Sequence, residues 1–282
     1  MSNLAIFEAL SIDCSKSVTK KYSTSFYTAV NQLHVDLHRP IHSIYGFVRL
    51  ADEIVDTFHA FEKRNLLDSF QVDTMRAIEK KISINPVLNS FQWVVNEYGI
   101  KKEYIEAFFN SMYADLEQKE WQTAAELKEY IYGSAEVVGL MCLQVFCAGD
   151  QQRVERLKPA AEALGSAFQK INFLRDLKED MDQLGRKYFK DVDFKNFDLE
   201  TKRKIEKEID DEFTKAYQGI KNLPPKAKFG VLLAYKYYYC LFQKIQKLAP
   251  HQVMEKRIRV DNMQKMLLLV KLKVRNTLNL VD

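Results

Sequence analysis

The chain has 282 residues, of which 47% are hydrophobic and 28% are charged, so it can bury a sizeable core and is not globally disordered. Its 42 basic and 38 acidic residues leave a formal net charge of +4, which is too small to indicate nucleic-acid binding. Nine glycines and six prolines are fewer than half of average usage, which argues against an all-β sandwich or barrel with its frequent turns.

Apolar residues recur at spacings of three and four along almost the whole chain, a pattern that predicts α-helices. Several breaks between the expected helices carry glycine or a proline pair. We find no repeat and no linker, and therefore expect one all-α domain over residues 1–282, a single helical bundle. The expected helices span residues 5–30, 40–59, 64–82, 86–98, 101–118, 123–147, 152–184, 198–221, 225–248 and 254–276.

The expected helix over residues 40–59 carries an acidic pair. Asp52 and Asp56 are four residues apart, so their carboxylates lie on one helix face, about 6 Å from each other. Arg49 is spaced to pair with Asp52 but not with Asp56. Because the chain has 38 acidic residues, one such pair arises easily by chance and is more simply a solvated helix face.

The expected helix over residues 152–184 repeats this spacing within a longer polar stripe. Apolar side chains flank the stripe, and Arg175 stands inside it as Arg49 stands beside the first pair. Arginine is suited to phosphate oxygens because its guanidinium donates two parallel hydrogen bonds. The stripe consists of Gln169, Asn172, Asp176 and Asp180.

The two acidic helices together indicate a particular chemistry. Two carboxylates on one helix repel each other, and a hard divalent cation that prefers oxygen ligands relieves that repulsion. Two such helices that face each other would hold Mg²⁺, and the metal would hold a diphosphate. The metal would then neutralise the charge of the departing diphosphate and so promote ionisation of the substrate.

The two segments resemble the two aspartate motifs of the squalene/phytoene synthase family, and its bacterial members most of all. The first motif is similar to residues 45–56, and the second to residues 169–180 with the Gly185-Arg186-Lys187-Tyr188-Phe189 segment after it. The order and spacing of further matches agree over roughly residues 15–270. These matches are Ser23-Thr-Ser25-Phe26, residues 130–139, Arg257-Ile-Arg259-Val260 and Lys265.

The resemblance implies an all-α isoprenoid synthase bundle with a central apolar cavity and a set of site residues. Tyr45 and Tyr237 would line the site. The metal would be held by Asp52, Asp56, Asp176 and Asp180, with Glu53 and Asn172 in support. The diphosphates would be bound by Ser25, Arg49, Gln169, Asn172, Arg175, Arg259 and Lys265.

Some positions depart from the family pattern. Thr24 stands where a basic residue is usual, and Glu53 replaces the commonest second aspartate. Ser134 and Glu136 stand where many members have valine and glycine, which puts the shape or polarity of the cavity there in question. None of these departures removes one of the four aspartates.

The reaction implied is the Mg²⁺-dependent head-to-head condensation of two prenyl diphosphates, with Mn²⁺ as a substitute metal. We expect a phytoene synthase of carotenoid biosynthesis that uses two geranylgeranyl diphosphates, because no dinucleotide-binding signature indicates a reductant. The alternative is a C30 synthase that uses two farnesyl diphosphates and gives dehydrosqualene or squalene, with NADPH needed only for squalene. A non-catalytic relative that acts as an assembly protein and a terpene cyclase are further alternatives.

The sequence also bears on location. The first residues lack the basic start and apolar run of a signal peptide, and no stretch reaches the roughly 18 apolar residues of a membrane-spanning helix. We therefore expect a cytoplasmic protein. Two interpretations of residues 265–275 stay open: a packed terminal helix, or a basic amphipathic helix that makes peripheral contact with an anionic membrane. The oligomeric state is not indicated.

Overall fold

Helices account for nearly all of the ordered structure in this chain. A computed structural model describes residues 2–118, 120–179, 188, 197–255 and 257–277, and these contain no β-strand, which confirms the all-α prediction. In chain order the helices are α1 (Asn3–Tyr22), α2 (Thr24–Val30), α3 (Val35–Asp56), α4 (Lys63–Lys80), α5 (Pro86–Tyr98), α6 (Lys102–Glu117), α7 (Ala124–Ile131), the π-helical turn η1 (Tyr132–Glu136), α8 (Val137–Phe146), α9 (Gln151–Glu179), α10 (Leu199–Lys221), α11 (Pro225–Gln246), α12 (Pro250–Val253) and α13 (Asn262–Thr277).

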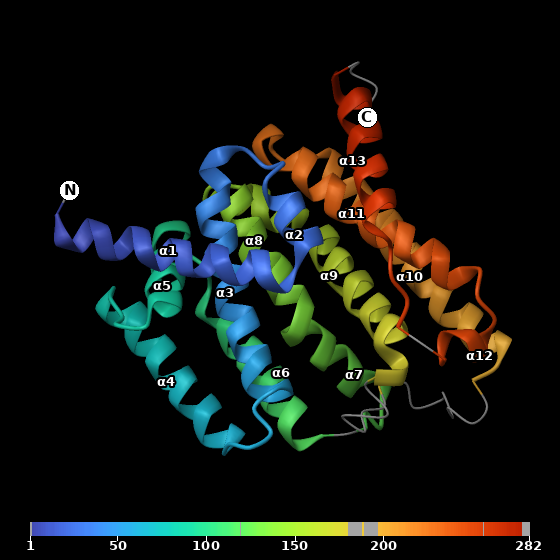
Figure 1. The fold of residues 1–282 in the computed structure, drawn as a ribbon, viewed down its shortest axis with the longest axis horizontal. Coiled ribbons are helices and arrows are strands. Elements are labelled where there is room, and N and C mark those ends of the chain that lie inside the picture. Colours follow the sequence, from blue (N-terminus) through green and yellow to red (C-terminus); the bar gives the residue numbers. More distant parts are fainter. Residues whose placement is uncertain (1, 119, 180–187, 189–196, 256, 278–282) are drawn as a thin grey trace.

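The helices with the two acidic motifs belong to different parts of the bundle (Figure 1). Helix α3 packs against α1, α4 and α5, whereas α9 packs against α10 and α11. Helix α8 contacts both α3 and α9 and therefore joins the two parts. None of the described helices is both long and apolar enough to cross a membrane.

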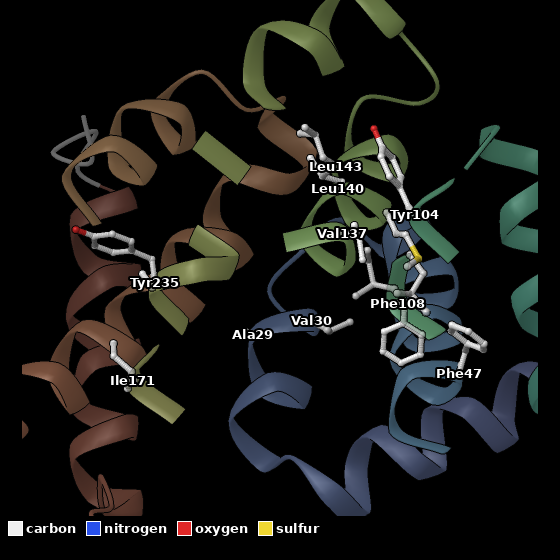
Figure 2. Close-up of a cluster of buried hydrophobic side chains, with 14 of the residues drawn as sticks. Ala29, Val30, Phe47, Tyr104, Phe108, Val137, Leu140, Leu143, Ile171 and Tyr235 are labelled. Atoms are coloured by element: carbon white, nitrogen blue, oxygen red, sulfur yellow. The ribbon is translucent and has the colours of Figure 1, made fainter. Parts of the chain in front are cut away.

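Helix α3 has one face in the core and one polar face. On the core side, the ring of Phe47 is fully buried and stacks on Phe91 at a centroid distance of 3.8 Å. Figure 2 shows Phe47 and Phe108 together in this buried cluster, where their centroids are 5.3 Å apart. The polar face follows the helical spacing of four, three and four residues and consists of Tyr45, Arg49, Asp52 and Asp56.

Two glycines allow helices to approach η1 closely. A Cβ atom on Gly133 would lie 2.1 Å from Ser111 Oγ of α6. A Cβ atom on Gly165 of α9 would lie 2.8 Å from the carbonyl oxygen of Ala135. Both distances are shorter than a van der Waals contact, so only glycine permits α6 and α9 to pack against the π-helical turn in this way.

Two predicted helices at the start of the chain have different boundaries in the structure. The helix expected over residues 5–30 is two helices, because Ser23 adopts an extended backbone and its side chain caps α2 by accepting from the Phe26 N–H. The helix expected to begin at Pro40 begins at Val35 instead, after the cap residue His34, and contains Pro40.

The predicted helix over residues 254–276 was also wrong in extent. Helix α12 ends at Val253, and α13 begins only at Asn262, where Asp261 accepts a hydrogen bond from the Gln264 N–H. Residues 257–261, here called the connector, are not helical and lead into α13. The end of the helix expected over residues 152–184 lies outside the described residues beyond Glu179.

We expect Phe47→Ala to lower the free energy of unfolding by about 3–5 kcal/mol, because it removes a fully buried ring from among other phenylalanines. The matched control is Phe61→Ala, since Phe61 is 68% exposed and its loss should change stability by less than about 0.5 kcal/mol. Urea denaturation followed by circular dichroism measures both values. Equal losses in the two variants would contradict the assignment of Phe47 to the core.

Candidate active site

The polar face of α3 crowds several charged side chains together. Arg49 pairs with Glu53, and its other terminal nitrogen lies 4.0 Å from Asp52 Oδ2. The guanidinium carbon also lies 4.5 Å from the centroid of the Tyr22 ring. Arg49 is therefore held mainly by Glu53 and the ring, and it offsets the charge of Asp52 only in part.

The carboxyl group of Asp52 is strongly perturbed. Its pKa is raised to about 7, chiefly by burial and also by the charges of Asp56, Asp115 and Glu53, while Arg49 acts in the opposite direction. Asp52 nevertheless keeps 31% side-chain exposure, so its oxygens remain accessible to a small ligand. A divalent cation would remove the repulsion, and carboxylate oxygens are ligands that Mg²⁺ prefers, so this donor set fits such an ion.

Asp115 of α6 is a further carboxylate at this place, beside Asp52, Glu53 and Asp56, and the sequence did not predict it. Its Oδ1 accepts a hydrogen bond of 2.8 Å from the Tyr130 hydroxyl. Tyr130 is buried in a small aromatic cluster with Trp121, Phe173 and Tyr188, which is separate from the main core. In the sequence, Asp115 has no acidic partner at helical spacing, and only the resemblance around residue 130 marked its neighbour Tyr130.

The second acidic motif lies on α9 and has a different electrostatic setting. Asp176 Oδ1 accepts from Arg175 Nε at 2.9 Å and lies 3.0 Å from Arg257 Nε. Arg257 also donates to Glu179 Oε2 at 2.9 Å. Because Arg257 belongs to the connector before α13, this ion pair ties the connector to the end of α9.

A tyrosine of α11 links the two motifs. The Tyr238 hydroxyl donates to Asn172 Oδ1 on α9 at 3.3 Å, and its ring stacks on Phe168 at 3.8 Å. Tyr45 of α3 has a pKa raised to about 12 by burial, and both Asp52 and Tyr238 contribute to the rise. Tyr45 is thus close to the α3 carboxylates and also to the tyrosine that binds Asn172, so the polar faces of α3 and α9 border the same region.

The predicted site residues fall into two groups. Those on α3 and those on α9 form the two clusters described above, and in the second cluster Asn172 Nδ2 also donates to Gln169 Oε1 at 3.4 Å. Tyr237 does not join them, because its hydroxyl donates to the Lys265 carbonyl at 3.2 Å and its buried ring faces α13. Tyr238, one residue later, contacts Asn172 of α9, and the role of Tyr237 in lining the site stays a prediction. Asp180 lies outside the described residues.

Within the part of the chain that is described, the predicted phosphate ligands outside α3 and α9 make no hydrogen bond or ion pair with either acidic motif. Ser25 lies partly buried on α2. Arg259 is exposed on the connector. Lys265 is partly buried at the start of α13, where burial and the charge of Arg259 lower its pKa, against the effect of Asp261. Their roles as phosphate ligands stay predictions.

Within the described residues, no three His, Cys, Asp or Glu side chains are arranged to hold a metal ion by themselves. A diphosphate and water would have to complete the coordination, as is usual for Mg²⁺. The expected central apolar cavity also stays a prediction, because the hollow found in the described part lies on the surface between α4, α5 and α6 and contains none of the predicted site residues.

Comparison with known proteins gives a consistent result. The model of the squalene/phytoene synthase family matches residues 19–264 of this chain. The chain is 24% identical to the phytoene synthase of Arthrospira platensis, over 92% of this chain and 91% of that one. It is also 24% identical to the 4,4'-diapophytoene synthase of Staphylococcus haemolyticus, over 71% and 70% of the two chains.

The fold has a clear counterpart among solved structures. The crystal structure of a dehydrosqualene synthase in complex with ligand superposes with a TM-score of 0.80 at 21% identity, covering 96% of this chain and 98% of the other. This likeness confirms the expected isoprenoid synthase type of bundle.

We expect Asp52→Asn to stabilise the metal-free protein at pH 8 by about 1–4 kcal/mol and to leave its stability unchanged at pH 4. The pKa of Asp52 is raised in the folded state. The stability that the protonated carboxyl contributes is therefore complete below its ordinary pKa and is lost as the pH rises through about 7. Thermal unfolding in EDTA at several pH values measures this.

The control for this experiment is Asp73→Asn, since Asp73 is exposed on α4 in a surface pair with Arg76. It should change stability by less than about 0.5 kcal/mol at either pH. A wild-type protein whose stability does not fall between pH 4 and pH 8 relative to Asp52→Asn would show that Asp52 is not perturbed.

Proposed function

Since the chain belongs to the squalene/phytoene synthase family of prenyltransferases, we propose that it condenses two molecules of geranylgeranyl diphosphate head to head into phytoene, through prephytoene diphosphate. The observation that supports this proposal is that Tyr45, beside the first aspartate motif, lies near Tyr238, whose hydroxyl donates to Asn172 of the second motif. The raised pKa of Asp52 adds support, because it indicates a place where a cation is favoured.

The metal ligands in this proposal come from both motifs. Asp52 and Asp56 of α3 and Asp176 of α9 would hold Mg²⁺, with Asp180 as the expected fourth aspartate and Glu53 and Asn172 in support. When bound, the metal supplies positive charge that stabilises the leaving diphosphate. Glu53 would act mainly by positioning Arg49, since it already binds that guanidinium.

The arginines of α9 and the connector would bind diphosphate. Arg175 and Arg257 both contact Asp176 in the structure. A metal ion held by Asp176 would neutralise this carboxylate, and Arg175 and Arg257 would then be available to donate to phosphate oxygens. Arg49 would do the same at the first motif, and Gln169, Ser25, Arg259 and Lys265 would provide further contacts.

Aromatic side chains would protect the cationic intermediates. Tyr45 stacks on Phe26 at 4.9 Å, and Tyr238 stacks on Phe168. Ring faces attract cations without attacking them, and they exclude water. The Tyr45 hydroxyl has a pKa of about 12 and stays protonated at neutral pH, so it does not present a phenolate nucleophile to a carbocation.

A C30 synthase is the second candidate. Two observations favour it: the diapophytoene synthase among the relatives and the dehydrosqualene synthase among the solved structures. The phytoene synthases align over more of this chain, which supports the C40 proposal. The two alternatives differ in substrate length, and only squalene formation would consume NADPH.

We expect the purified chain with Mg²⁺ to convert geranylgeranyl diphosphate into phytoene at the same rate with and without NADPH, because the product gains no hydride. Farnesyl diphosphate should react more slowly. Extraction and chromatography of the hydrocarbon products measure both. Formation of a C30 product from farnesyl diphosphate, with no turnover of geranylgeranyl diphosphate, would replace the first candidate by the second.

We expect Asp52→Asn and Asp176→Asn each to lower kcat by at least about 100-fold, because each removes a metal-binding carboxylate that stabilises the leaving group. Circular dichroism should show unchanged helical content. Asp73→Asn serves as the control and should keep full activity, since Asp73 is exposed on α4. Full activity of either motif variant would rule out the metal assignment.

A further inference from the structure

Helix α13 presents a continuous apolar face to solvent. It packs against α11, and Leu272 on its inner side is buried, with Leu268 and Leu269 also packed against the core. The outer side carries five large apolar side chains that are 53–69% exposed and recur at helical spacing. These outer residues, here called the outer stripe, are Met263, Met266, Leu267, Val270 and Val274. An exposed apolar face of this kind marks an interaction surface.

The charged residues of α13 itself all have the same sign. Residues 262–277 include three lysines and one arginine but no aspartate or glutamate. At 100° per residue, Lys271 and Lys273 lie roughly 80° to either side of the centre of the outer stripe, and both are exposed. The stripe is therefore bordered by positive charge on both edges.

The positive charge continues onto α11 along one edge. Burial lowers the pKa of Lys236, and the nearby charges of Arg275 and Lys271 lower it further. Lys236 also lies over the rings of Tyr217, Tyr235 and Tyr239 at 5.3–5.9 Å. Basic groups of two helices thus gather beside the stripe, on the side of the bundle where α13 stands at the edge of the molecule (Figure 1).

We propose that the outer stripe of α13 docks onto a lipid bilayer with anionic headgroups. A bilayer offers both chemistries that this face needs, since acyl chains cover the apolar side chains while headgroup phosphates meet the lysines. A second copy of the chain fits less well. A symmetric contact through the same face would bring together two helices whose charged residues are all basic, and these would repel each other.

Docking at α13 would also bring the reaction close to the membrane, a consequence that rests on the proposed function. The start of α13 is tied to α11 through the hydrogen bond from Tyr237 to the Lys265 carbonyl. The connector before it is tied to Asp176 through Arg257. A C30 or C40 hydrocarbon has no solubility in water, so a product released beside this helix would pass directly into the bilayer.

Co-sedimentation of the full chain with vesicles tests the proposal without any substrate. We compare vesicles of phosphatidylcholine alone with vesicles that also contain phosphatidylglycerol. The wild type should bind the anionic vesicles, and high salt should weaken the binding. Leu267→Ser with Val270→Ser, and separately Lys271→Glu with Lys273→Glu, should each lower the apparent affinity by about tenfold or more.

Two matched pairs control for loss of apolar area and of charge. Ile82→Ser with Ile84→Ser removes apolar side chains that are 50% and 98% exposed elsewhere on the surface. Lys204→Glu with Lys207→Glu reverses two exposed charges on α10. Both control pairs should bind vesicles like the wild type, and all four variants should keep the helical content and thermal stability of the wild type.

Three outcomes would overturn the proposal: no binding of the wild type to anionic vesicles, equal binding by the α13 variants, or a dimer in light scattering that only the stripe variant dissociates while vesicle binding stays unchanged. Turnover in detergent is measured separately. A chain that binds vesicles but converts no prenyl diphosphate would contradict the proposed function and leave the docking surface intact.

Discussion

Crowding of carboxylates at the polar face of α3 is the constraint on which the proposed chemistry depends. Asp52 is pressed against Asp56 and lies near Asp115 from α6, and burial makes its ionisation still more costly. The protein offsets this local cost with the packing on the opposite face of the same helix, where Phe47 stacks on Phe91 in the core. The same helix therefore carries both the electrostatic repulsion and the core packing that offsets its cost.

The two acidic motifs are not equivalent, although their spacing is the same. Asp176 on α9 already has Arg175 and Arg257 as counter-charges. Asp52 lies 4.0 Å from a terminal nitrogen of Arg49, and that arginine pairs more closely with Glu53. A cation would be attracted more strongly to the α3 carboxylates, because their charges are less well neutralised. At Asp176 it would compete with Arg175 and Arg257, and these arginines would then be available for phosphate.

Much of this arrangement followed from local pattern, and the rest depended on tertiary contacts. Helical spacing alone placed Tyr45, Arg49, Asp52 and Asp56 on one face, because that spacing is a property of the helix itself.

Asp115 and Arg257 could not be predicted in this way, since each reaches the site from a distant segment. The expectation for Tyr237 rests on the resemblance alone. Neighbouring residues on a helix differ by about 100° in direction, so only packing fixes that it is Tyr238 that contacts Asn172. The break at Ser23 and the late start of α13 at Asn262 did not follow from the spacing, because the capping side chains of Ser23 and Asp261 set these boundaries within otherwise helical patterns.

The π-helical turn η1 has a geometric consequence for the whole middle of the chain. The Val137 N–H bonds to the carbonyl of Tyr132, five residues earlier, so the turn holds one residue more than an α-helix would. That additional residue rotates everything after it by about 100° relative to everything before it. Upstream, Tyr130 points into the small aromatic cluster that fixes Asp115; downstream, Val137 and Leu140 point into the main core. The inserted residue therefore lets one continuous helical segment direct its first half toward the small aromatic cluster and its second half toward the main core.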